Sequence, residues 1–252
     1  MPSPQLRAAP LLAAALLAIP ALTAARAPAP TADEVIARWI TARGGRAQLK
    51  SVHSARLFGR ISFGPENGGP LVVLIARPPR IRTQFTLDQR TMVQGYDGRI
   101  AWLSDGSSAQ QLPADQAKNV AAGADLDGPL LEYASKGNRV VFAGLDTADG
   151  RPAWRLDVTL ANGLRDSYFI DTASSLQTKW RGARTEQAQP VVYESWFHDY
   201  RAAGGVLFAY RIDSRTVGRS GGQTIALDSV QLNVPVTAAD FAMPAAPAPK
   251  TP

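Results

Sequence analysis

The chain has 252 residues, a formal net charge of +6 and 45% hydrophobic residues, and it contains no cysteine. The absence of cysteine excludes disulfide bonds, thiolate metal sites and attachment of a lipid to a cysteine of this chain. Because the basic residues are scattered rather than clustered, the charge predicts no nucleic-acid interface and only a weak attraction to anionic surfaces.

The first 27 residues have the order of a secretory signal peptide. Arg7 precedes an apolar run over residues 11–21, and small residues follow that run. The run is shorter than the about 20 residues that a membrane-spanning helix needs. We therefore expect a signal peptide over residues 1–27, cleaved after Ala25 or Ala27, with an uncleaved N-terminal anchor as the alternative. An exported protein is not expected to meet nucleic acid, so no such partner is predicted.

A helix is expected directly after this leader. Thr31 and Glu34 have the T-x-x-E spacing of a capping box, and apolar residues follow at helical spacing. Gly44-Gly45 is a typical helix end. The pattern predicts one amphipathic helix over residues 32–43 and a short second turn over residues 47–50.

From Val52 onward the pattern changes to alternating strands. Leu57 and Ile61 share one face of the first strand, and Ile81 and Phe85 share one face of a later one. The dipeptide Asp97-Gly98 then predicts a tight hairpin turn, followed by a strand with Trp102.

An alanine-rich, helix-compatible insert over residues 113–137 interrupts the strands, which then continue to about Leu232. The expected fold class is mainly β (α+β), with about eleven strands in one curled antiparallel sheet. Short turns between neighbouring strands favour an antiparallel meander, and a sheet this long curls into an unclosed barrel. The N-terminal helix and the insert would form a lid over an apolar cavity. We expect one domain over residues 28–244 and a disordered Pro/Ala tail over residues 245–252.

One sequence motif of hydrolases is present. The string GRSGG places Ser220 in a G-x-S-x-G motif. A nucleophile elbow needs a strand before it, a helix after it and a later histidine, whereas both histidines, His53 and His198, precede it. We interpret the string as a hairpin loop and expect no catalytic residue.

The sequence also predicts neither a metal site nor a cofactor. Two histidines and no cysteine leave few metal ligands. Asp125 and Asp127 match half a calcium loop but lack its last acidic ligand, so helix capping is the preferred interpretation. Glu194, His198 and Asp199 are interpreted as surface pairs, although paired carboxylates for hydrolysis stay open.

Several segments resemble the LolA-like family of periplasmic lipoprotein carriers. "LIARPPRIRTQF" followed by "VQGYDGRIAWLSDG" contains the Arg77-Pro78 pair, the apolar Ile81, the Asp97-Gly98 turn and Trp102 in the order of that family. The segment "VPVTAADFAMP" is similar to the closing segment of the family's lipoprotein-sorting branch. The resemblance implies an unclosed barrel with a helical lid, which holds acyl chains and performs no chemistry.

The resemblance also implies particular site residues. The arginine that matches Arg77 bonds backbone carbonyls of the lid in the carriers and holds the empty cavity shut; an ordinary strand-end arginine facing water is the alternative. Apolar residues of the sheet would form the cavity wall, with plain core packing as the alternative for each. These residues are Leu57, Ile61, Ile81, Phe85, Trp102, Trp154, Leu156 and Val158.

Three functions compete on this sequence. The first is a monomeric periplasmic carrier of lipoprotein acyl chains or lipid, which the resemblance links to an inner-membrane transporter and an outer-membrane acceptor. The second is a sensing or interaction domain on the same fold, which binds lipid or lipoprotein and reports to a partner. The third is a hydrolase of apolar esters, which the motifs disfavour.

Overall fold

The computed structural model describes residues 28–64, 67–186 and 189–245. The expected signal peptide, and all but the first residue of the expected tail, lie outside these described residues. Within the described ranges, no helix is long and apolar enough to cross a membrane.

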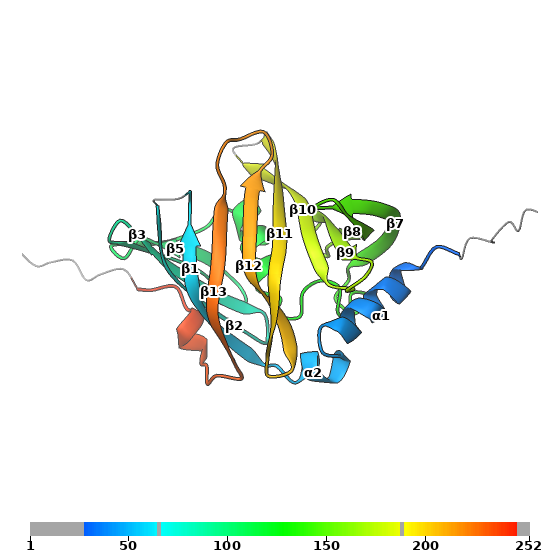
Figure 1. Cartoon of the computed structure of the whole chain (residues 1–252). Coiled ribbons are helices and arrows are strands. Elements are labelled where there is room, and N and C mark those ends of the chain that lie inside the picture. Colours follow the sequence, from blue (N-terminus) through cyan, green and yellow to red (C-terminus); the bar gives the residue numbers. More distant parts are fainter. Residues whose placement is uncertain (1–27, 65–66, 187–188, 246–252) are drawn as a thin grey trace, which may run out of the picture.

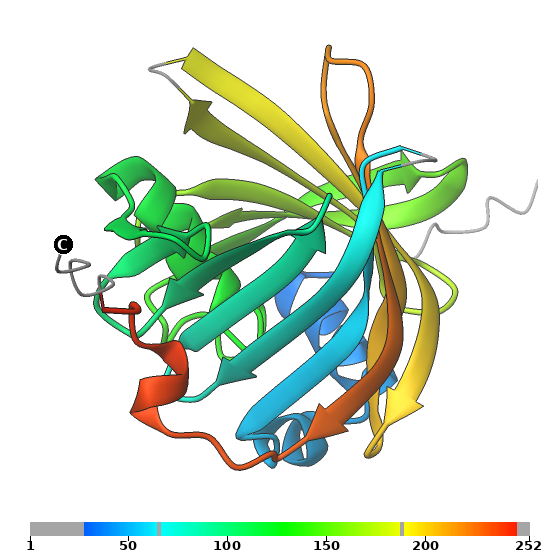
Figure 2. The same cartoon turned by 90° about the vertical axis from the view of Figure 1, so that its left-hand side faces the viewer.

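One antiparallel sheet of thirteen strands forms the body of the protein, in the order β6-β5-β4-β3-β2-β1-β13-β12-β11-β10-β9-β8-β7. The strands are β1 (Ser54–Ser62), β2 (Gly68–Ala76), β3 (Arg80–Leu87), β4 (Arg90–Tyr96), β5 (Ala101–Ser104), β6 (Ala109–Gln111), β7 (Arg139–Ala148), β8 (Arg151–Thr159), β9 (Arg165–Asp171), β10 (Gln177–Glu186), β11 (Gln189–Ala203), β12 (Val206–Thr216) and β13 (Gln223–Leu232). The two edge strands, β6 and β7, do not pair with each other, so the curled sheet is an unclosed barrel (Figure 2). The predicted fold class is confirmed, with two more strands than expected. One strand that the pattern does not mark is β6, whose three residues are too few for a period-two signal.

Two helices precede the sheet, α1 (Ala32–Ala42) and α2 (Arg46–Lys50). The predicted capping box is present, because the Thr31 side chain accepts from the backbone N–H of Glu34 and the Glu34 carboxylate accepts from that of Thr31. The apolar stripe of α1 is buried against β8 and β9 on the concave side of the sheet, beside β7 (Figure 1). Each buried side chain of this stripe contributes about 1.5–3 kcal/mol, which is enough to dock so short a helix.

The predicted helical insert contains one helix, α3 (Ala114–Gly123), followed by turns through residue 138. No residue of α3 is buried, whereas Leu130 and Leu131 of the following turns are each 1% exposed and pack beside α1. We call residues 124–138 the turn segment. The expectation that Asp125 or Asp127 caps a helix is wrong, because no helix begins in this segment.

The C-terminal residues cross the convex side of the sheet and end in a short 3-10 helix, η1 (Ala238–Phe241), drawn in red in Figure 2. Phe241 is fully buried, and its carbonyl oxygen accepts a hydrogen bond of 2.9 Å from Nε1 of Trp102. The expectation that Trp102 lines the cavity is therefore wrong. Gly95 pairs with Trp102 and leaves room for the indole on this face, since a Cβ on Gly95 would lie 2.3 Å from the ring.

Candidate ligand-binding cavity

A cavity of about 860 Å³ lies on the concave side of the sheet beneath α3. Ile81 and Thr83 of β3 and Gln94 of β4 line one side, and residues of β10 to β13 line another. Volumes of about 300–1,000 Å³ are typical of small-molecule sites. The curl of the sheet produces this space, because α1 and the turn segment fill the concave side only over β7 to β9.

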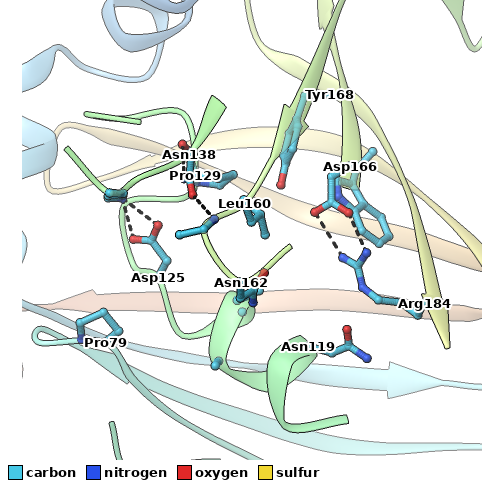
Figure 3. A pocket seen from close by; sticks show the side chains of 16 residues that line it. Pro79, Asn119, Asp125, Pro129, Asn138, Leu160, Asn162, Asp166, Tyr168 and Arg184 are labelled. Carbon is cyan, nitrogen blue, oxygen red and sulfur yellow. Dashed lines mark hydrogen bonds and ion pairs between the residues drawn. The ribbon is translucent and has the colours of Figure 1, made fainter. Parts of the chain in front are cut away.

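A second cavity of about 450 Å³ lies on the other side of α3 and is shown in Figure 3. It shares four lining residues with the first cavity: Asn119, Gly123, Trp180 and Arg184. The helix therefore divides the concave space into two chambers, and its movement would join them.

The helix α3 lies beside β3, β4, β5 and β10 without burying any residue fully. Its N-cap residue, Pro113, provides no side-chain hydrogen bond to the first turn, and no residue of the helix is buried. A hydrogen bond joins the helix to the connection between β8 and β9, from Nδ2 of Asn162 to the carbonyl oxygen of Lys118, at 3.2 Å. A helix with so little burial is expected to open at a lower free energy than the core.

Arg77 follows β2 and points to the helical elements. Its Nη1 donates to the carbonyl oxygen of Lys50 at 2.8 Å, and its Nη2 donates to that of Leu49 at 3.2 Å and to the Asp127 carboxylate. The two carbonyls belong to the end of α2, where a cation is favourable. Arg77 thus joins α2 to the turn segment that continues from α3. Its role in opening stays a prediction.

The turn segment has further ties. Nζ of Lys136 bonds both carboxylate oxygens of Asp125, at 2.8 and 2.7 Å, and the carbonyl oxygen of Gly128. Burial raises the pKa of Asp125, although the bond from Lys136 opposes this effect. Tyr133 donates to Asp33 of α1 at 2.9 Å. The segment is therefore tied to α1 and, through Arg77, to α2, and α3 leads directly into it.

Four of the five cavity-wall residues predicted in the first half of the sheet face its concave side, and the fifth, Trp102, faces the convex side. Ile81 lines the cavity directly, and the pairing registers put Leu57, Ile61 and Phe85 on the same face as Ile81. These four residues are not shown to touch a ligand, so that role stays a prediction.

The three residues predicted in the second half have different surroundings. Trp154, Leu156 and Val158 also face inward, but they belong to the core beneath α1, and Leu156 and Val158 are at most 2% exposed. The expectation that they line the cavity therefore fails in this arrangement, because the helix fills the space that the strand pattern leaves open. Arg38 of α1 covers the Trp154 ring at 5.0 Å.

The sequence did not single out the ion pair at the junction of the two chambers. Arg184 and Asp166 form two hydrogen bonds, at 2.7 and 3.2 Å, and their side chains are 11% and 3% exposed. The guanidinium also lies 4.9 Å from the centre of the Trp180 ring. In Figure 3 the pair stands between Tyr168 and Asn119. Burial raises the pKa of the Tyr168 hydroxyl far above its usual value, so this group stays neutral.

One glycine in the sequence could have indicated this ion pair. Gly182 lies opposite Asp166 in the β9–β10 pairing, and a Cβ there would lie 2.4 Å from the Asp166 carboxylate. A glycine inside a strand often marks a place where another group approaches the backbone closely.

The residues of the rejected catalytic motifs lie on β11 and in the connection between β12 and β13. Ser220 lies in the loop between β12 and β13, as expected for a hairpin. Nε2 of His198 lies 3.6 Å from Asp213, and Glu194 is bound by Lys179 and Arg215, each at 2.7 Å. Burial opposes ionisation of Glu194, but these hydrogen bonds outweigh it and lower its pKa. The described part of the chain contains no group of three residues that could hold a metal ion.

No protein-family model matches the chain, and no curated protein matches it. Several solved structures are similar to it in fold. A LolA superfamily protein from Nitrosomonas europaea has a TM-score of 0.58 and 14% identity, covering 85% of this chain and 98% of its own. A proposed outer membrane lipoprotein-sorting protein domain from Vibrio parahaemolyticus has a TM-score of 0.56 and 10% identity, with 83% and 97% covered. A DUF1329 family protein from Desulfovibrio piger has a TM-score of 0.56 and 9% identity, with 84% and 97% covered.

Proposed function

We propose that this chain, which has the LolA-like fold, is a periplasmic carrier that holds acyl chains of lipoproteins or lipids in the cavity beneath α3 and catalyses no reaction. One observation carries the proposal: a curled sheet encloses a concave space, and a helix without a buried residue covers that space. The apolar residues Ile81 and Val120 and the ring of Trp180 provide contact surface for methylene groups.

Loading is coupled to the contacts of Arg77. An acyl chain that enters between α3 and the sheet displaces α3, and α3 continues directly into the turn segment that Arg77 holds against α2. The closed arrangement is stabilised by the Arg77 bonds and the occupied one by burial of the chain. A ligand that binds only the open arrangement shifts the population towards it.

The remaining parts of the proposal concern export, the monomeric state and the partner proteins. Residues 1–27 direct export and are removed, and residues 28–244 form one domain that acts as a monomer. The carrier receives its cargo from an inner-membrane transporter and passes it to an outer-membrane acceptor. The structural relatives that are described as a LolA superfamily protein and a proposed lipoprotein-sorting domain support lipoprotein as the cargo.

Photo-crosslinking tests where the chain binds. A fatty acid that carries a diazirine near its end is incubated with the mature protein, irradiated and mapped by peptide mass spectrometry. The proposal predicts labels on α3, β3 and β10. Labels confined to the convex side under η1, or no saturable labelling at all, would overturn it.

A further inference from the structure

Many of the side chains that line the cavity beneath α3 can form hydrogen bonds. Thr83, Gln94, Tyr193 and Gln223 line it, are only partly buried, and have no hydrogen-bond partner for their side chains within the described residues. Asn119 of α3 goes further, because its Oδ1 is buried from water and also lacks a partner. An unpaired buried acceptor costs about 1–3 kcal/mol, which a donor from a bound molecule would recover.

The strand register places polar residues of three neighbouring strands in one row. Gln223 pairs in register with Ser214, and Ser214 with Ser195, so three polar residues lie side by side on β13, β12 and β11. The hydroxyls of Ser195 and Ser214 are 2.8 Å apart. One of these two O–H groups donates to the other, which leaves a second O–H for another acceptor.

A row of apolar residues lies directly beside this polar row. Two residues further along the same face of the same strands, Ile225, Ile212 and Phe197 form the next in-register row, and Ile61 of β1 extends it. The concave wall is therefore polar in one row and apolar in the next. A bare hydrocarbon chain would leave the polar row without partners, whereas an amphiphile would match both rows.

The charge of the lining favours an uncharged polar group. The Arg184 guanidinium already forms two bonds with Asp166, which neutralises it and places a carboxylate beside any incoming anion. A second guanidinium, that of Arg219, also lines the cavity and has an interaction partner of its own. The other polar side chains of the lining are amides and hydroxyls, which serve both as donors and as acceptors.

We propose that the cargo enters together with an uncharged head group bearing hydroxyl or amide groups, which binds Asn119 and the Gln223–Ser214–Ser195 row while the acyl chain lies on the apolar row. The inference rests on the proposed carrier function and names its substrate class. Glycerol esters and N-acyl amides share the required chemistry. The head group thus lies inside the cavity rather than in solvent.

A matched ligand series tests the inference. Four lauroyl compounds compete against the fluorescent fatty acid cis-parinaric acid on the mature protein: monolaurin with hydroxyls, lauramide with an amide, methyl laurate with no donor, and laurate with a charge. One or two added hydrogen bonds predict that monolaurin or lauramide binds about tenfold more tightly than methyl laurate. Which of the two binds more tightly distinguishes the two sources of the head group.

Two variants locate the effect. Asn119→Leu and Gln223→Leu should bring the affinities for the donor ligands to within about threefold of methyl laurate. Gln231→Leu, the same change on an exposed, outward-facing residue of β13, should leave the preference intact. Binding of methyl laurate by each variant reports that it is folded.

The outcomes separate the two proposals. Equal binding of all four compounds would overturn the head-group inference and leave the acyl-chain carrier standing. Tightest binding of laurate would overturn it in favour of an anion site. If the folded protein binds neither cis-parinaric acid nor any of the four compounds, both proposals fail.

Discussion

Replacing Arg77 with alanine should increase the affinity of the protein for an acyl ligand. The guanidinium makes two bonds to backbone carbonyls of α2 and one to the Asp127 carboxylate, and the Arg77 and Asp127 side chains are 24% and 18% exposed. Bonds that involve a charged group contribute about 1.5–3 kcal/mol each when buried, and solvent exposure reduces that value. We take about 2 kcal/mol for the three bonds together, and all three must break when α3 opens. Removing it beforehand predicts an affinity on the order of 30-fold higher.

The assay is competition with cis-parinaric acid on the wild-type protein, Arg77→Ala and Arg77→Lys. Lysine keeps the charge but offers a single ammonium in place of the planar group, so its effect should be intermediate. Arg60→Ala is the matched control, because Arg60 is exposed and has no ion pair in the described part of the chain. Circular dichroism confirms that each variant is folded. An Arg77→Ala protein that is folded and binds no more tightly than Arg60→Ala would refute the coupling.

Three further predictions concern helix α3, the ion pair of Arg184 and Asp166, and the stability of the protein at acid pH. Asn162→Ala removes the hydrogen bond to Lys118 and should speed hydrogen exchange of α3 several-fold with little change in Tm; unchanged exchange would show that other contacts hold the helix. Asp166→Asn leaves the charge of Arg184 buried without its partner and should lower the free energy of unfolding in urea by about 3 kcal/mol, and a loss below about 1 kcal/mol would show that water already screens the pair. Glu194 has a lowered pKa in the folded protein, so its contribution to stability is complete above the pKa of an unfolded glutamate and is lost as the pH falls through the folded pKa. Melting curves measured at several pH values should therefore show a smaller loss of Tm at acid pH for Glu194→Gln than for the wild-type protein.

Local chemistry explains the elements that the sequence predicted well. Thr31 and Glu34 cap α1 through contacts between residues three apart, which spacing alone can reveal. The Asp97 carboxylate accepts from the N–H groups of Arg99 and Ile100, as its turn signal implies. The alternation of strand residues also predicted the sheet, because side chains on a strand point to opposite faces in turn.

Long-range packing explains what the sequence could not predict. Alternation separates the two faces of a strand, but it does not say which face becomes concave, and Trp102 was placed on the wrong one. Its partner, Phe241, lies 139 residues further along the chain. For Leu156 the face was predicted correctly, but α1 occupies the space above it.

The ion pair of Arg184 and Asp166 illustrates a third limit. Its two residues come from neighbouring strands, and only the register of those strands brings them together. No spacing rule within one strand contains that register. The ion pair at the junction of the two chambers could therefore be found only from the structure.

The central claim is that the protein carries acyl chains, and native mass spectrometry tests it most directly. The mature protein is purified from a periplasm without detergent and measured intact, before and after incubation with added lipid. The account predicts bound masses that fragment into acyl chains. A protein that is isolated bare and also fails to take up added lipid would contradict the account.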